Sequence, residues 1–121
     1  MSASFYTLVI DENPQVQGNL RRLLNRLGCE VTLADTEGQG ISRLASSKYH
    51  AVFVALCGKA IRGREVARWV KIYGNGTKVF VVTSWRGELE EKVLAVDGIH
   101  GVVHKPLIFS EVRDVMLEHL G

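Results

Sequence analysis

The chain has 121 residues, 46% of them hydrophobic, and carries a formal charge of +2. That length can bury one sizeable core and is too short for two ordinary domains, so we expect a single domain over residues 1–121. The modest charge, with basic residues scattered among acids, does not favour direct binding to nucleic acid or to an anionic membrane. No apolar run approaches the roughly 18 residues of a membrane span, and the first residues lack the build of a signal peptide. We therefore expect a cytoplasmic protein.

The chain has two cysteines, Cys29 and Cys57, which lie far apart in the sequence. They form no Cys-x-x-Cys motif and have no histidine partners at metal-ligand spacing. We expect both to be reduced and to serve in packing.

Five short apolar runs recur at fairly even spacing and predict five strands. The runs at Val52 to Leu56 and Val79 to Val82 are continuously apolar and rich in β-branched residues, which is typical of strands covered on both faces of a parallel sheet. The predicted strands are residues 6–10, 30–34, 51–56, 78–83 and 101–104.

The stretches between these runs have helical periodicity and carry start and stop signals. Asn13 can cap the first helix, Pro14 suits its first position, and Gly28 suits a left-handed exit. Thr36 can cap the second helix and Ser110 the last. The apolar residues expected to be buried include Ile41, Leu44 and Ala45 in the second helix, and further helices are expected over residues 64–73 and 88–96.

Strand and helix alternate five times, which predicts an α/β doubly wound domain with a parallel sheet. In such sheets ligands bind outside the carboxyl ends of the strands. The candidate site residues at these ends are Asp11, Glu12, Ala55, Thr83, Ser84 and Lys105.

Several segments at these positions resemble a known family. They are residues 8–14 (LVIDENP), 49–56 (YHAVFVAL), Gly63, 81–84 (VVTS) and 104–106 (HKP). On these segments the whole chain resembles the receiver domain of two-component response regulators. The resemblance implies a flavodoxin-like fold of five β-α units, with a five-stranded parallel sheet in the order 2-1-3-4-5. Residues 27–32 (LGCEVT) also resemble receivers attached to hybrid histidine kinases.

The resemblance implies roles for four residues. In the family, two acids after the first strand hold Mg²⁺, and Asp11 and Glu12 match that pair. Thr83 matches the hydroxyl residue that hydrogen-bonds the phosphoryl group, and Lys105 matches the lysine that contacts it. The bond before Pro106 corresponds to one that is often cis in the family.

One position departs from the family in a way that changes the chemistry. The aspartate that takes phosphate from a phosphohistidine is replaced by Ala55, whose methyl group is neither a nucleophile nor a metal ligand. No aspartate or glutamate lies between Glu37 and Glu65, so a shifted alignment cannot restore it. In addition, Val102 replaces the usual aromatic switch residue, and Lys59 stands where a proline is usual.

Two features have alternative interpretations. Asp11 and Glu12 can retain a weak cation site, or Asp11 can be held by Lys105, and we expect the second because Mg²⁺ has lost one carboxylate ligand. The stretch without acids contributes five cations, which form either a docking surface for an acidic partner or a solvated face. These are Arg43, Lys48, Lys59, Arg62 and Arg64.

The sequence therefore predicts a pseudo-receiver: a signalling module, not an enzyme, that is not phosphorylated and needs no cofactor. It would act by binding a signalling protein such as a histidine kinase or another regulator, or by forming a homodimer. Candidate interface residues are Trp85, Val102, His104 and Val112. The alternative is a small-molecule or redox sensor that uses the vacated pocket near Ala55, Cys57 and Lys105.

Overall fold

The computed structural model describes residues 4–56, 61–74, 76–85, 94–95 and 97–120. Five parallel strands form one sheet in the order β2-β1-β3-β4-β5, as the family resemblance implied. They are β1 (Tyr6–Ile10), β2 (Glu30–Ala34), β3 (Ala51–Ala55), β4 (Lys78–Thr83) and β5 (Gly101–His104).

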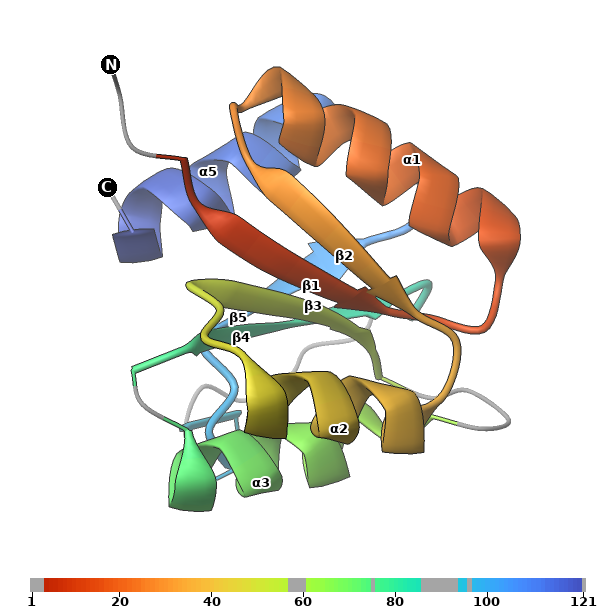
Figure 1. Ribbon diagram of the computed structural model, residues 1–121. Helices are drawn as coiled ribbons and strands as arrows, with labels where there is room; N and C mark the ends of the chain where they lie inside the picture. Colours follow the sequence, from red (N-terminus) through yellow and green to blue (C-terminus); the bar gives the residue numbers. More distant parts are fainter. Residues whose placement is uncertain (1–3, 57–60, 75, 86–93, 96, 121) are drawn as a thin grey trace.

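Helices cover both faces of this sheet. α1 and α5 lie on one face, and α2 and α3 lie on the other (Figure 1). The helices are α1 (Pro14–Arg26), α2 (Glu37–Ser46), α3 (Gly63–Tyr73) and α5 (Phe109–Leu120). Most of the helix predicted over residues 88–96 lies outside the described residues, although residues 94, 95 and 97 are helical. The α/β doubly wound, flavodoxin-like architecture is thus confirmed.

The capping signals explain where the first two helices begin and where the first one ends. The side chain of Asn13 accepts a hydrogen bond from the backbone N–H of Gln15, and Pro14 is the first residue of α1. After the last turn, Gly28 has φ 81°, a conformation that favours glycine. Thr36 caps α2 by accepting from the N–H of Gln39. These predictions are confirmed.

The last helix begins earlier than predicted. The carbonyl of Ile108 accepts from the N–H groups of Glu111 and Val112, and α5 starts at Phe109. Ser110 is therefore inside the first turn and not its cap. A hydroxyl residue within one or two positions of a helix start is a weak guide to the exact boundary.

The second helix packs on the sheet through a glycine. Gly40 is the buried residue of α2, whereas Ile41 and Leu44 are half-buried and Ala45 is exposed. A Cβ at Gly40 would collide with the side chain of Ile10, lying 2.8 Å from its Cγ1 atom. The absence of a side chain at Gly40 thus lets α2 approach β1 closely. Gly40 faces the sheet, whereas Ala45 is exposed, so the predicted burial of Ala45 was wrong.

The core has two halves, one on each face of the central strand. All of β3 is buried. Phe53 faces α1 and α5, where its ring packs 5.1 Å from that of Phe80. Val52 and Val54 face α2 and α3. A strand covered on both faces places its carboxyl end, at Ala55, in a fixed position next to the neighbouring strand ends.

Within the described ranges, no helix is both long enough and apolar enough to cross a membrane.

Candidate functional site

Asp11 follows β1 directly and is only 3% exposed. Its Oδ1 atom accepts a hydrogen bond from the backbone N–H of Asn13 at 2.8 Å. Its Oδ2 atom is buried and has no hydrogen-bond partner. A buried carboxylate oxygen without a donor is costly unless a positive charge lies near it.

Lys105 supplies that charge. Its Nζ atom lies 3.9 Å from the Oδ2 atom of Asp11. Lys105 comes directly after β5, and its backbone N–H donates to the carbonyl of Thr83 at 2.8 Å, which fixes where its side chain begins. The bond from Lys105 to Pro106 is cis, as the resemblance implied. The contact between Lys105 and Asp11 is the one expected from the sequence.

Gln17 was missed by the sequence interpretation. It is a buried residue of α1, 7% exposed, and its Nε2 atom donates to the backbone carbonyl of Asp11 and, at 2.7 Å, to Oδ1 of Asp35. Gln17 therefore ties the loop after β1 to the loop after β2. The sequence signal for its burial was its place next to Val16 and near Leu20, two apolar positions of the same helix face.

The residues present do not form the donor set that Mg²⁺ requires. Mg²⁺ is held by near-octahedral oxygen ligands, and carboxylates must converge on it. Asp11 offers one buried oxygen, but Glu12 is exposed and Lys105 already approaches that oxygen. Within the part of the chain that the structure describes, no three His, Cys, Asp or Glu side chains could hold a metal ion together.

Ala55 is at the carboxyl end of β3, beside β4. It is 5% exposed and pairs in register with Val82, and its methyl group belongs to the apolar core on the side of α2 and α3. Gly63, at the start of α3, packs against the same point, since a Cβ there would lie 2.5 Å from the carbonyl oxygen of Ala55. The position of the family's phospho-acceptor is therefore occupied by a side chain that is part of the hydrophobic core.

Thr83 is the last residue of β4, the strand paired with β3, and Trp85 follows it by two residues. The Oγ1 atom of Thr83 accepts a hydrogen bond from the backbone N–H of Trp85 at 3.1 Å, so the hydroxyl binds the loop that follows its own strand. The indole of Trp85 is 52% exposed. A cavity of about 630 Å³ is lined by Leu56, Val82, Thr83, Ser84, Trp85 and Lys105. The cavity is thus lined by a lysine, two hydroxyls and apolar groups.

The predicted interface residues on β5 and α5 are less available than expected. Val112 is fully buried, because it lies on the inward face of α5, so its assignment to an interface was wrong. Val102 is half-buried and packs on the core beside Val81. Glu111 binds His104 twice, accepting from its backbone N–H at 2.6 Å and lying 3.1 Å from its Nδ1 atom. Trp85 is the most exposed of the four.

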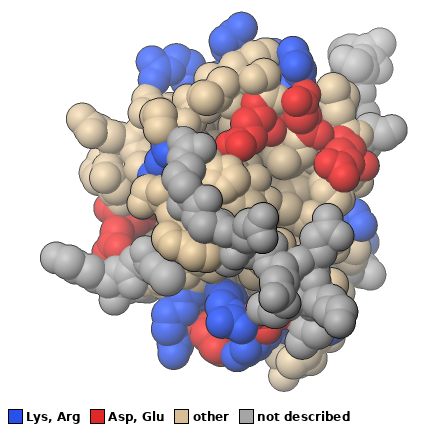
Figure 2. Space-filling view, turned by 180° about the vertical axis from the view of Figure 1, so that it is seen from behind, with Lys and Arg blue, Asp and Glu red and all other residues tan. Residues whose placement is uncertain are grey.

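Two cations of the predicted basic surface are paired with acids. Arg62 binds Glu37, with Nη2 and Oε2 3.0 Å apart. Arg64 and Arg68 both bind the buried carboxylate of Asp97, at 2.6 and 3.1 Å. Figure 2 shows Lys and Arg side chains gathered around a few acids at the lower edge of the molecule, the side of α3. This part of the surface is closer to neutral than the sequence suggested.

These pairs shift the ionisation of the two acids. The hydrogen bond from Arg64 is the main cause that lowers the pKa of Asp97, and Arg68 adds to it. The hydrogen bond from Arg62 likewise lowers the pKa of Glu37. Both carboxylates therefore favour their charged form in the folded chain.

Within the described residues, Cys29 gives no support to redox chemistry. Cys29 is buried, and burial raises the pKa of its thiol, so it favours the unreactive protonated form. Cys57 and Lys59 lie outside the described residues. The sensor interpretation that used Cys57 remains a prediction.

The sequence matches the profile of one protein family. The profile of the response regulator receiver domain matches residues 7–116. Ethylene receptor 3 of rice is 29% identical over 117 residues, which cover 93% of this chain and 14% of the receptor. Response regulator MprA of Mycolicibacterium vanbaalenii is 29% identical over 106 residues, which cover 87% of this chain and 46% of that protein. The chain thus spans less than half of the length of these relatives.

Solved structures share the fold. Chemotaxis response regulator CheY4 of Vibrio cholerae superposes with a TM-score of 0.87 at 14% identity, covering 98% of this chain and 100% of that one. The receiver domain of sensor histidine kinase PA1611 from Pseudomonas aeruginosa, which has a magnesium ion in its active site cleft, gives 0.83 at 19% identity, covering 97% and 98%. With the profile match over most of its length, the chain belongs to the response regulator receiver domain family of two-component signalling.

Proposed function

We propose that this receiver domain is not phosphorylated and that it signals by binding another signalling protein in a fixed conformation. One observation carries the proposal: the carboxyl end of β3 presents the buried methyl group of Ala55, and no acid lies between Glu37 and Glu65. Phosphoryl transfer to this strand end lacks a nucleophile. Receiver domains are signalling modules, so loss of the acceptor leaves protein binding as the role that the fold can still serve.

Contacts around the site support a fixed conformation. Lys105 lies beside Asp11, where it takes the place of a metal charge. Thr83 accepts from the N–H of Trp85, and Glu111 holds both the backbone and the ring of His104. The first two contacts engage Lys105 and Thr83, the groups that phosphorylation would otherwise have to recruit. We infer one resting arrangement that requires neither phosphate nor Mg²⁺.

The binding surface that we propose centres on Trp85. Exposed tryptophan is enriched among the residues that dominate binding energy at protein interfaces. Trp85 is half-exposed and lines the cavity of about 630 Å³ together with Lys105. A histidine kinase or another regulator in the cytoplasm is the partner class we favour, since one structure with a similar fold is the receiver of a sensor histidine kinase.

The first experiment exposes the purified domain to acetyl phosphate, or to beryllofluoride, with Mg²⁺. We expect no increase in mass and no shift of the backbone NMR signals of β3 and β4. The matched control is Ala55→Asp, which supplies the missing carboxylate beside Asp11 and Lys105. A specific phospho-adduct on the unmodified chain would disprove the proposal.

The second experiment addresses partner binding. The wild-type domain and Ala55→Asp are used as bait, each with and without beryllofluoride and Mg²⁺. We expect the wild type to capture the same partner under both conditions. Capture by the wild type only when beryllofluoride is present would contradict a fixed conformation.

A further inference from the structure

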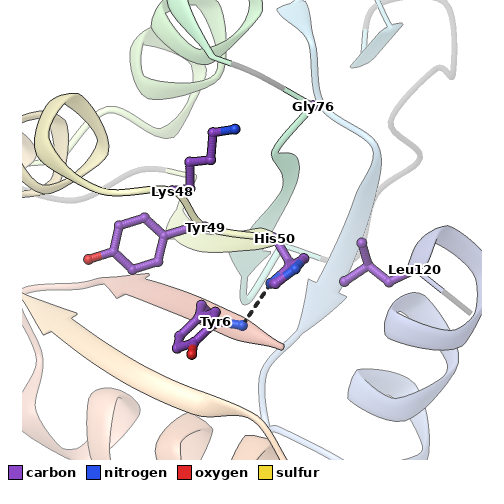
Figure 3. Close-up of a pocket in the computed structure, with 6 residues that line it drawn as sticks. All are labelled: Tyr6, Lys48, Tyr49, His50, Gly76 and Leu120. Atoms are coloured by element: carbon purple, nitrogen blue, oxygen red, sulfur yellow. Dashed lines mark hydrogen bonds between the residues drawn. The ribbon is translucent and has the colours of Figure 1, made fainter. Parts of the chain in front are cut away.

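Two histidines make the same pair of hydrogen bonds at the amino-terminal ends of the strands, the end of the sheet opposite to the candidate site. His50 immediately precedes β3, and its Nδ1 atom accepts from the backbone N–H of Tyr6 in β1 at 2.9 Å (Figure 3). His100 immediately precedes β5, and its Nδ1 atom accepts from the N–H of Val79 in β4 at 3.0 Å. The imidazole thus serves as the acceptor for a strand N–H at both places.

The backbone completes each pair. The N–H of His50 donates to the carbonyl of Tyr6 at 2.8 Å, and the N–H of His100 donates to the carbonyl of Val79 at 2.8 Å. Each histidine therefore exchanges two hydrogen bonds with one residue of the neighbouring strand. We call this arrangement a histidine latch; one joins β1 to β3 and the other joins β4 to β5.

We propose that the two histidine latches make the amino edge of the sheet acid-sensitive, because protonation of Nδ1 removes the acceptor that the strand N–H requires. A neutral imidazole has one nitrogen that donates and one that accepts, whereas the imidazolium only donates. The bond from Tyr6 or Val79 therefore fixes the hydrogen of the neutral ring on Nε2. A proton added at Nδ1 would lie against the hydrogen of the strand N–H, and the hydrogen bond between them would be lost.

The ring of His50 packs against two aromatic side chains. Its ring is stacked on that of Tyr6, with centroids 5.8 Å apart, and meets the edge of Phe5 at 5.1 Å. A cavity of about 430 Å³ is lined in part by His50, and Figure 3 shows the residues around it. Apart from His50 itself, the titratable groups that line this cavity are Tyr6, Tyr49 and the cation Lys48, and the remaining lining residues, Gly76 and Leu120, are uncharged.

His100 is surrounded by groups that oppose its protonation. Partial burial is the main cause that lowers its pKa, and the charge of Lys78 in β4 and His119 in α5 lowers it further. The rings of His100 and His119 lie 6.0 Å apart, and His119 also packs on Phe80. The folded chain therefore favours the neutral form of His100, in which the latch is closed.

The sign of the effect follows from this preference. The stabilising contribution of the His100 latch is complete above the usual histidine pKa of about 6.5 and is lost as the pH falls through the lower value in the folded chain. The latched strands β3 and β5 lead to Ala55 and to Lys105 at their opposite ends. Acid thus loosens the two strands that position the candidate site.

The test is amide hydrogen exchange of the wild-type domain at pH 7.5 and 4.5, corrected for intrinsic rates, because the lower pH must lie below the lowered pKa of His100. We expect the protection factors of Tyr6 and Val79 to fall by about tenfold at pH 4.5, the worth of a typical hydrogen bond. The amides of Val9 and Val81, in the middle of β1 and β4, should change much less. Imidazole ¹⁵N shifts at pH 7.5 should show hydrogen on Nε2 of both rings.

Variants supply the matched control. His50→Asn and His100→Asn keep a short acceptor that does not titrate, so the acid-induced loss of protection at the neighbouring amide should disappear. His104→Asn removes a histidine that lies beside Glu111 and forms no latch, so the loss at Tyr6 and Val79 should remain. Protection factors that are equal at both pH values in the wild type, or hydrogen on Nδ1 at pH 7.5, would overturn the proposal.

Discussion

The Nζ atom of Lys105 lies 3.9 Å from Oδ2 of Asp11, and within the described residues that oxygen is the one buried side-chain polar atom without a hydrogen bond. The lysine is one-third exposed, whereas the carboxylate is almost fully buried. The positive charge therefore approaches from the solvent side and balances a carboxylate that cannot reach water. This ion pair gives the region a balanced charge without a metal.

The first prediction concerns this pair. Lys105→Met removes the charge and keeps most of the side-chain volume, leaving Asp11 buried without a cation. We expect a loss of about 1–3 kcal/mol in the free energy of unfolding, because an uncompensated buried carboxylate is costly. Denaturant unfolding measures it.

The same variant tests whether the carboxylate can attract a metal ion. Mg²⁺ should stabilise Lys105→Met more than it stabilises the wild type, since the competing ammonium is gone. The control is Lys105→Met combined with Asp11→Asn, in which both the loss and the Mg²⁺ effect should largely disappear. Equal Mg²⁺ effects in the wild type and the single variant would contradict this account.

The second prediction concerns Asp97, which two arginines of α3 hold. Asp97→Asn should lower the free energy of unfolding by about 1–2 kcal/mol at pH 7, a moderate value because both arginines are about half-exposed. Glu65→Gln, which removes only an exposed partner of Arg68, should change it by less than about 0.5 kcal/mol.

The pH dependence of the same variant has a defined sign. The pKa of Asp97 is lowered in the folded chain, so its contribution is present above the unfolded value of about 3.9 and is lost as the pH falls through the lower folded value. The difference between wild type and Asp97→Asn should therefore shrink between pH 5 and pH 2. A difference that stays constant over this range would show that the charge of Asp97 is not what matters.

The third prediction compares two glycines that lie in helices. Gly40→Ala places a Cβ against Ile10 and should destabilise the fold by about 1–3 kcal/mol through overpacking. Gly18→Ala in α1 meets nothing within 4 Å and should stabilise it by up to about 1 kcal/mol, because alanine has the higher helix propensity. Thermal unfolding distinguishes them, and a loss of stability in both would mean that α1 is more closely covered than the structure shows.

The fourth prediction tests the proposed binding surface. Trp85→Ala should weaken capture of the partner by about tenfold or more, because exposed tryptophans commonly dominate interfaces. The free energy of unfolding of the variant should differ from that of the wild type by less than about 0.5 kcal/mol. Trp85 is half-exposed, and its hydrogen bond to Thr83 is donated by the backbone N–H, which alanine keeps. Tyr73→Ala, an exposed aromatic residue on α3, is the control and should leave capture unchanged.

Much of the fold could be predicted because local signals and the burial pattern agree. The apolar run of β3, the cap at Asn13 and the exit at Gly28 each specify one element independently of the rest of the chain. The order of the strands came from the family resemblance, since periodicity alone does not determine which strands are neighbours.

The site was harder to predict, because its interactions join residues far apart in the chain. The role of Gln17 depends on how α1 is rotated against the loops after β1 and β2, and the pairing of Arg64 with Asp97 depends on a separation of 33 residues. Such contacts require the packed structure. Val112 differs, because apolar residues at helical spacing favour burial, so its place in the core was already indicated by the pattern of α5.

The close contact between Gly63 and the backbone of Ala55 has a consequence for how sequences of this kind are classified. The glycine is required because a side chain would strike a carbonyl of the main chain, whatever side chain stands at position 55. A chain can therefore keep this glycine for a purely steric reason after the chemistry beside it has gone. Such a glycine raises the sequence similarity to the family without indicating that the chain can be phosphorylated. That ability has to be judged from the residue at the acceptor position.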